Sequence, residues 1–427
     1  MCLKWDIPPT VKIVHNLVWT SITVGRRFFL GSFVNANRSS HFFVPVGGLI
    51  VLHKNNYQSM TKERISYIDL GAGIMILWMI LGHALGVSWN LQLYGLWDVT
   101  DLSLLPKGVP TYLDEDGKVH NLYPSVVFPF LSFFMPWFFY KSGQFFSHLT
   151  IAEEWKKDWG KLMRQFLIWS ALGYILYVGF CYIEGNFTLR QITYRVLKTF
   201  ILEGNIKLNT PLWFLFTLFG VRQIANILLP KNDSKFYWIQ CIAIILLGYI
   251  VSYAAYRYNH RLLPEWVANG STGLAFFTMG YCLKKYETKW WLLIPCLIVY
   301  AACCIYEFPV VSMKSNFLHS GKYLLYMPTC LCGIVVFNMV CRLISKYIPF
   351  LSRPFEYIGI YAMIIYVSHG LLYRPIYNIL YDFELTSLMP YSLWIILASY
   401  VIFLPLFCVL SDRINRKKQT DIKATSL

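Results

Sequence analysis

The polar residue that stands out most in the chain is His83, in the run LGHALG near the end of a long apolar stretch. A neutral imidazole in a low-dielectric cleft can accept a proton from a hydroxyl group, a step that raises rates by typically 10² to 10⁴. Asp69 lies fourteen residues earlier, roughly 21 Å away along a helix, so the two side chains cannot touch. His83 is therefore a candidate general base, with a structurally hydrogen-bonded histidine as the alternative. Asp69 is expected to support packing or capping at the cytoplasmic edge.

A second histidine, His369, lies in the run YVSHGLLYRP late in the chain. Counted along helices, it lies roughly 22 Å from the inner side of the membrane, against roughly 27 Å for His83. The two residues are thus near the same level, and we expect His369 and Arg374 to line one cleft with His83. The alternative is that His369 only orients other side chains. Trp213, in PLWFLF, is expected as an aromatic residue at the outer mouth of that cleft.

Cationic residues gather toward the opposite end of the expected helices. Lys141, in FFYKSGQFF, lies roughly 9 Å inside the cytoplasmic end of its span. Its ammonium group could bind an anionic or dipolar ligand, or it could extend to the inner interface. The following segment, EEWKKDWGKLMR, includes Lys161 and Arg164 among aromatic residues at helical spacing. This pattern is typical of a helix lying at the interface, and it could also offer phosphate groups a landing patch.

Two more polar positions have expected supporting roles. Ser142 follows Lys141 in a small-residue turn, where close packing between helices is the simplest interpretation. Glu356, in FEYIG, is expected at the inner edge of its span, where Arg353 could pair with it.

Composition sets the class of protein that must hold these residues. Of the 427 residues, 56% are hydrophobic and only 14% are charged, and the mean hydropathy is +0.47. A soluble domain carries about a quarter charged residues. The formal net charge of +16 fits Lys and Arg in cytoplasmic loops and is not taken as a sign of nucleic-acid binding. The eleven cysteines lie mostly in apolar stretches without zinc-type spacing, so we expect no metal site.

The apolar stretches predict an all-α, polytopic membrane protein with about ten transmembrane helices. Each stretch is near the roughly 20 residues that a helix needs to cross a bilayer. The predicted spans are residues 65–87, 126–147, 164–183, 211–229, 236–256, 267–283, 290–306, 322–343, 354–377 and 390–411. Lys and Arg are more frequent in one set of alternating loops, which predicts that both termini are cytoplasmic. The long outer loops are residues 88–125 and 184–210, and the second is expected to contain a short helix.

The first 59 residues differ from the rest of the chain. Their apolar runs are too short to span, and they lack the pattern of a signal peptide. Met60 opens a charged segment that runs directly into the first span. We therefore expect residues 1–59 to be an extension with the natural start at Met60, the alternative being an interfacial N-terminal arm. Residues 60–412 form the membrane domain, and residues 413–427 form a basic cytoplasmic tail.

Five segments stand in order along the chain: RISYIDLGAGIMILWMILGHA, MPWFFYKSGQFF, KLMRQFLIW, NTPLWFLFTLF and FEYIGIYAMIIYVSHG. Together they resemble the acyltransferase-3 family of membrane O-acyltransferases. The resemblance extends from about Ile65 to Leu410, nearly the whole chain after Met60. It implies a fold of about ten helices that moves an acyl group from cytoplasmic acyl-coenzyme A to a hydroxyl of an extracytoplasmic or lipid-linked glycan. The first-helix histidine of the family corresponds to His83.

One departure from the family's pattern concerns the acyl donor. Many members carry Arg or Lys eleven residues before the histidine, where this chain has Ala72. Ala72 lies roughly 10 Å deep, close to the depth of Lys141. We expect Lys141 to supply the missing cation, with Lys161 and Arg164 as further donor-binding residues.

The expected protein is thus an enzyme of the plasma (inner) membrane that acetylates a surface glycan. Acetyl-coenzyme A would be its co-substrate, the bilayer and the glycan its partners, and no metal is implied. In this interpretation His369, Arg374 and Trp213 line the acceptor cleft. The rival is a glycan or lipid exporter without covalent chemistry, against which stand the lack of internal repeats and the scarcity of charge within the spans. The oligomeric state stays open, a homo-oligomer included.

Overall fold

The computed structural model describes most of the chain after residue 65. The described residues are 66–92, 111–113, 119–121, 131, 133–231, 235–257, 264–286, 289–306 and 323–425. All of them belong to one compact unit, Ser66–Leu427. The predicted extension of residues 1–59, the expected start at Met60 and most of the loop of residues 88–125 lie outside the described residues and stay predictions.

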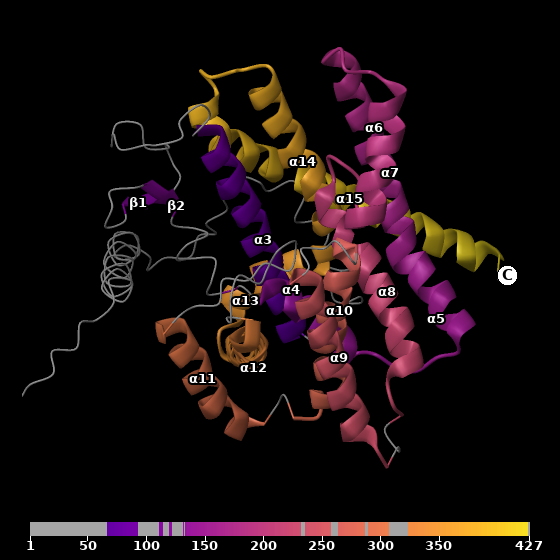
Figure 1. The fold of residues 1–427 in the computed structure, drawn as a ribbon, viewed down its shortest axis with the longest axis vertical. Coiled ribbons are helices and arrows are strands. Elements are labelled where there is room, and N and C mark those ends of the chain that lie inside the picture. Colours follow the sequence, from indigo (N-terminus) through magenta and orange to yellow (C-terminus); the bar gives the residue numbers. More distant parts are fainter. Residues whose placement is uncertain are drawn as a thin grey trace, which may run out of the picture. The chain divides into compact units, whose positions relative to one another are not determined.

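Helices make up nearly all of this unit, as the sequence predicted, and Figure 1 shows them coloured in chain order. The α-helices are α3 (Ser66–Gln92), α4 (Phe134–Gln144), α5 (Ile151–Asp158), α6 (Arg164–Ile183), α7 (Val196–Glu203), α8 (Trp213–Leu228), α9 (Tyr237–Arg257), α10 (Glu265–Leu283), α11 (Leu293–Tyr306), α12 (Tyr323–Tyr347), α13 (Pro349–Ile360), α14 (Ala362–Asp382) and α15 (Ser392–Thr425). Short π or 3₁₀ segments are η5 (Trp159–Met163), η6 (Arg190–Arg195), η7 (Thr210–Leu212), η8 (Trp290–Leu292) and η10 (Met389–Tyr391). An antiparallel hairpin of β1 (Thr111–Leu113) and β2 (Val119–Asn121), which the sequence did not suggest, pairs Tyr112 with His120.

The lengths of the helices confirm a multi-pass membrane protein. Six helical stretches in the described part of the chain are long and apolar enough to cross a bilayer, and the bent pair of α13 and α14 makes seven if it counts as one span. α4 has 11 residues and α11 has 14, both short of the roughly 20 that a full crossing needs. The count of ten spans and the cytoplasmic placement of both termini therefore stay predictions.

Residues 354–377 were predicted as one span, the ninth. They do not form a single straight helix. They consist of the end of α13 and most of α14, whose axes differ by 69°. The break falls at Tyr361, where the backbone leaves helical geometry with φ −95° and ψ 8°. Packing explains the bend. A Cβ atom on Gly359 would lie 1.8 Å from the backbone oxygen of Asp69, so α13 is held directly against α3 just before the break.

Glycines allow two pairs of helices to pack backbone against backbone. α3 and α13 meet at Gly73 as well as at Gly359, because a Cβ on Gly73 would lie 2.0 Å from the Phe355 oxygen. α4 and α10 meet in the same way at Gly143 and Gly280. Small residues at such crossings are typical of membrane helices, where close van der Waals packing drives association. The close approach of α4 and α10 at Gly143 confirms the packing role expected for the turn that holds Ser142 and Gly143.

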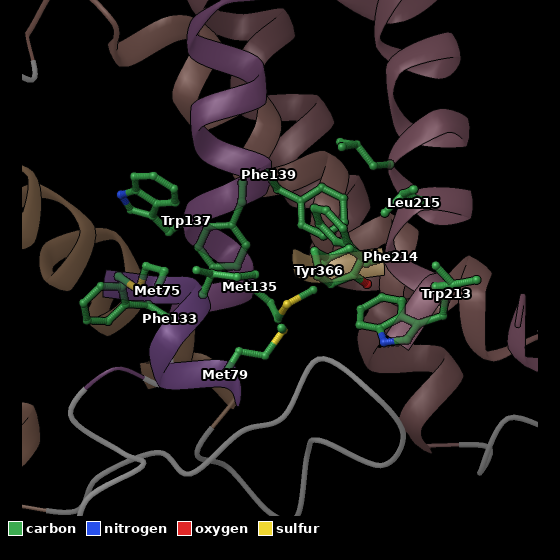
Figure 2. Close-up of a cluster of buried hydrophobic side chains, with 14 of the residues drawn as sticks. Met75, Met79, Phe133, Met135, Trp137, Phe139, Trp213, Phe214, Leu215 and Tyr366 are labelled. Atoms are coloured by element: carbon green, nitrogen blue, oxygen red, sulfur yellow. The ribbon is translucent and has the colours of Figure 1, made fainter. Parts of the chain in front are cut away.

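Sulfur-containing and aromatic side chains fill the interior between α3, α4, α8 and α14. Figure 2 shows Met75 and Met79 of α3 beside Met135 of α4, with Phe214 of α8 and Tyr366 of α14 on the far side. Aromatic rings make edge-to-face contacts across this cluster, with Phe139 4.9 Å from Phe214 and Phe214 5.6 Å from Tyr366 between ring centroids. The result is a dry interior next to the histidines described below.

The loop of residues 184–210 contains a short helix, as expected. It is formed by η6 and α7, and it ends at Gly204, whose φ of +70° fits the left-handed conformation that commonly terminates helices. Pro211 then opens η7, and its missing N–H group is not needed in the first helical turn. These signals return the chain to the bundle at α8.

Candidate functional site

The structure brings His83 and His369 together. His83 on α3 and His369 on α14 stack with 5.3 Å between ring centroids. Tyr373, one turn beyond His369, stacks on His83 at 5.0 Å with an interplanar angle of 11°. His369 is fully buried and His83 is partly buried. The two histidines are thus adjacent, as expected for residues of one cleft, although the depth of His369 was counted along a straight helix and α13 and α14 are bent by 69°.

Hydrogen bonds fix the orientation of His369. Its Nδ1 lies 2.7 Å from the carbonyl oxygen of Tyr366, and a carbonyl oxygen only accepts, so Nδ1 carries a proton. Nε2 of the neutral ring then holds the lone pair. Among the described residues Nε2 is buried without a hydrogen-bond partner. A buried polar atom left in this way calls for an explanation, and a catalytic role is one of those known.

A segment before α8 supports the same wall of the site. Tyr366 donates its hydroxyl hydrogen to the Pro211 carbonyl oxygen. Asn209, fully buried, donates to the Val367 carbonyl at 3.0 Å and approaches Gly370 closely enough that a Cβ there would lie 2.3 Å from its Oδ1. The chain between α7 and α8 therefore locks the turn of α14 that carries His369.

Arg374 and Trp213 occupy different surroundings. Arg374 is partly exposed, with its guanidinium 5.5 Å from the Tyr373 ring, and its Nε has no hydrogen-bond partner within the described ranges. Trp213, expected at an open mouth, is instead 6% exposed and belongs to the aromatic cluster at the start of α8 (Figure 2). The predicted position of Trp213 at an open mouth was wrong, because the turn at Pro211 directs the first residues of α8 into the interior.

Lys141 is held inside the protein at the other end of α3. The side chain is 5% exposed, its Nζ lies 3.0 Å from the Gln144 amide oxygen, and it faces the Tyr67 ring at 5.1 Å. The Tyr67 ring contacts a second cation, Arg342 of α12, at 4.1 Å, and the Arg342 guanidinium donates to the Tyr67 hydroxyl at 2.6 Å. Two cations therefore meet at one aromatic ring. Lys141 does not extend away from the bundle, and Arg342 was not singled out from the sequence.

A buried ionic network links α5 to α8. Arg222 donates to both carboxylate oxygens of Asp158, at 2.9 and 2.8 Å, and also to Glu154. It reaches Ser142 at 3.2 Å, which gives Ser142 a polar contact in addition to its packing role. This network was not predicted from the sequence. Its signal was the pair Glu154 and Asp158, spaced one turn apart on a helix face.

Because of this network, substitutions of two of its cations should differ strongly in their effect on the free energy of unfolding. Arg222→Met leaves the Asp158 carboxylate, 3% exposed, without a cation and the Glu154 carboxylate, 0% exposed, with Lys157 alone, and we expect it to lower the free energy of unfolding by about 3 kcal/mol. Lys157→Met removes only the exposed partner of Glu154, which should change stability by less than about 1 kcal/mol. Thermal unfolding of the two variants in detergent, followed by tryptophan fluorescence, measures the difference. Equal losses would contradict a structural role for Arg222.

The remaining predicted residues lie around the inner end of α3 and at the start of α6. Glu356 accepts hydrogen bonds from Ser66 and from Ser345, the latter at 3.2 Å. No ion pair joins Glu356 to Arg353 in the described part of the chain, so that expected pairing was wrong. Asp69 lies in the first turn of α3 and contributes its backbone oxygen to the contact with Gly359.

Lys161 and Arg164 are exposed on η5 and the first turn of α6. Trp155 and Trp159 of the same segment are also exposed, and their rings stack on each other with 6.0 Å between centroids, as expected for an amphipathic surface. Neither basic residue is close to the Lys141 cluster by any described contact.

Two groups of residues, at opposite ends of α3, therefore suit a reaction at a hydroxyl group. The paired imidazoles can take up and hold a proton, and the Lys141 and Arg342 cluster offers positive charge at the opposite end of α3. Within the described residues no three His, Cys, Asp or Glu side chains are grouped as a metal site would require.

Comparison with known proteins gives the family of the chain. Neither the curated proteins nor the solved structures include a significant match to the chain. A family model described as an acyltransferase domain matches residues 65–411, which include both histidines and the cation cluster. The chain therefore belongs to the acyltransferase-3 family of multi-pass membrane proteins.

Proposed function

We propose that this protein is an O-acyltransferase of the plasma membrane that uses His83 as a general base. It transfers an acyl group, and an acetyl group in particular, from acyl-coenzyme A to a hydroxyl of an extracytoplasmic or lipid-linked glycan. The ten-span topology with both termini in the cytoplasm belongs to the same proposal, since it places Lys141 at the donor side and His83 toward the acceptor side. The observation that carries it is the stack of His83 on His369 and Tyr373.

The chemistry begins with the acceptor hydroxyl. His83 removes its proton as the oxygen attacks the thioester carbonyl, an ester bond forms, and the carbon–sulfur bond breaks to release coenzyme A. The proton taken by His83 then goes to the thiolate that leaves. His369 supports this step by its position, because its ring lies against His83 and its own Nδ1 proton is held by the Tyr366 carbonyl. The buried surroundings keep competing water away from the thioester.

The donor is proposed to approach from the other end of α3. Tyr67 and His83 are sixteen residues apart, roughly 24 Å along the helix. The cations at Tyr67 would hold the nucleotide phosphates, for which Lys and Arg are the common partners in proteins. Met75 and Met79 lie between the two ends on α3 and are buried. Methionine side chains repack readily, so they would allow the pantetheine arm to pass toward His83.

The proposed role of Lys141 predicts a rescue. Lys141→Ala should weaken acetyl-coenzyme A binding about tenfold, since one charged contact to a phosphate is lost. Ala72→Arg in that background should restore part of the affinity, because residue 72 lies at similar depth and is the family's usual position for the cation. Binding of acetyl-coenzyme A to the purified protein, measured by calorimetry, gives the result. Lys161→Ala, at an exposed position, is the matched control and should change affinity less.

Unchanged donor affinity in Lys141→Ala would remove that lysine from the donor site. Loss of affinity without rescue by Ala72→Arg would leave Lys141 as a donor residue but contradict the exchange of position between the two helices.

The proposed function is tested most directly on the glycans of cells that carry the gene. Mass spectrometry of surface glycans should show a loss of 42 mass units per acetyl group when the gene is deleted, and His83→Ala should not restore it. Accumulation of an otherwise unchanged glycan inside the cells would instead identify an exporter.

A further inference from the structure

A polar cavity of about 190 Å³ lies between the C-terminal ends of α6 and α14. It is lined by two carboxylates, Glu184 and Asp382, and by two cations, Arg195 and Lys207, together with the Tyr177 ring. Sites that enclose drug-sized ligands measure roughly 300 to 1,000 Å³. This cavity is smaller and suits a compact charged group.

The charged side chains of the cavity are arranged to bind a ligand. The Glu184 and Asp382 carboxyl groups lie close enough to interact electrostatically, so two like charges are adjacent. No ion pair in the described part of the chain joins either of them to Arg195 or Lys207. The Lys207 ammonium instead faces the Tyr177 ring at 5.3 Å. A ligand with a cation at one end and an anion at the other would satisfy both pairs of charges.

The cavity does not face the histidines. Asp382 follows His369 by thirteen residues, which places the two on different sides of α14 at about 100° per residue. Leu371, which shares the side of Asp382, packs near Gly173 of α6, whereas His369 stacks on His83 of α3. A glycan held in the cavity would therefore have to pass around α14 to reach the site of acyl transfer.

Apolar side chains surround the same ends of the helices. Ile183 at the end of α6, Phe187 just after it and Phe383 just after α14 are all exposed. On a membrane protein such side chains contact acyl chains, while a charged cavity at a helix end lies at the level of lipid headgroups. A phospholipid seated here would have its acyl chains beside these residues and its headgroup in the cavity.

We propose that this cavity binds the headgroup of a phospholipid with a primary ammonium group, such as phosphatidylethanolamine. Glu184 and Asp382 accept hydrogen bonds from the ammonium, and Arg195 and Lys207 bind the phosphate. Gln191 lines the cavity with an Oε1 atom that is buried and has no hydrogen-bond partner among the described residues, and it supplies a further acceptor for the ammonium. The site is independent of the acyltransferase reaction and does not rest on it.

Native mass spectrometry of the full-length protein tests this proposal. The protein is equilibrated with equal amounts of phosphatidylethanolamine, phosphatidylcholine and phosphatidylglycerol. We expect about tenfold stronger retention of phosphatidylethanolamine, because choline has no N–H donor and glycerol has no charge for the carboxylates. The double variant Glu184→Gln with Asp382→Asn should lose this preference, and Arg195→Gln should weaken retention of all three lipids. Arg190→Gln, an exposed arginine of the same segment that does not line the cavity, is the control and should behave as the wild type.

Equal retention of the three lipids by the wild type, or a preference that survives in the double variant, would overturn the proposal. Displacement of the lipid by oligosaccharides but not by free phosphoethanolamine would mean that the cavity is a sugar site. Competition by phosphoethanolamine is measured on the wild type alone, so the proposal remains testable if a variant does not fold.

Discussion

His83→Ala should insert normally, retain its affinity for acyl-coenzyme A and lose acyl transfer by a factor of about 10² to 10⁴ in kcat. The loss follows from the role of the imidazole, which accepts the proton of the attacking hydroxyl and is not required to hold the donor. Acetyl transfer to purified glycan is measured beside donor binding by calorimetry, on protein in nanodiscs. A variant that loses donor binding and turnover together would point to a structural histidine.

Two further variants separate the roles of the paired rings. His83→Gln keeps hydrogen-bonding capacity but cannot accept a proton at neutral pH, so it should be as slow as His83→Ala. His369→Ala should raise the KM for the acceptor more than it lowers kcat, because His369 shapes the site and orients His83. A stricter requirement for His369 would move the general base to α14, where the buried Nε2 of that residue carries the lone pair.

Gly280→Val should prevent the bundle from assembling. A Cβ at this position would lie 1.9 Å from the Tyr140 backbone oxygen, whereas an unstrained carbon–oxygen contact is about 3.3 Å. α4 and α10 would have to move apart by about 1.4 Å over their closest contact. No rotamer change relieves this clash because the obstacle is backbone. We expect no folded protein by fluorescence-detected size-exclusion chromatography, and the same result for Gly143→Val on the facing helix.

The matched control is Gly220→Ala on α8, where a Cβ would meet nothing within 4 Å. Alanine is also the better helix former, so this variant should be at least as stable as the wild type. Folded Gly280→Val protein with unchanged thermal stability would contradict the backbone contact between α4 and α10.

The sequence was most informative about where the helices lie in the chain and how far along a helix each residue stands. Apolar runs located the helices, and a rise of 1.5 Å per residue placed His83 and His369 at similar depth. Neither argument shows which helices are neighbours. That His369 stacks on His83, and that Lys141 meets Arg342 across Tyr67, depends on contacts between segments far apart in the chain.

The errors have physical causes of the same kind. The bend at Tyr361 was missed because a run of apolar residues is compatible with one straight span, and the contact that pins Gly359 to Asp69 is invisible in either segment alone. Glu356 was assigned to a nearby arginine in sequence, but its partners, Ser66 and Ser345, come from two other helices. Arg222 was not singled out from the sequence, because the carboxylates that bury it belong to another helix, α5.

The bend at Tyr361 has a structural consequence for the two histidines. His83 belongs to a continuous helix, α3. His369 lies on α14, beyond the bend, and the helix before the bend, α13, packs against α3 at Gly73 and Gly359. The Tyr361 hydroxyl ties the bend itself to Asp412 of α15 at 2.7 Å. The bend thus turns α14 out of line with α13, and the hydrogen bond to Asp412 connects the helix that carries His369 to the last helix of the chain.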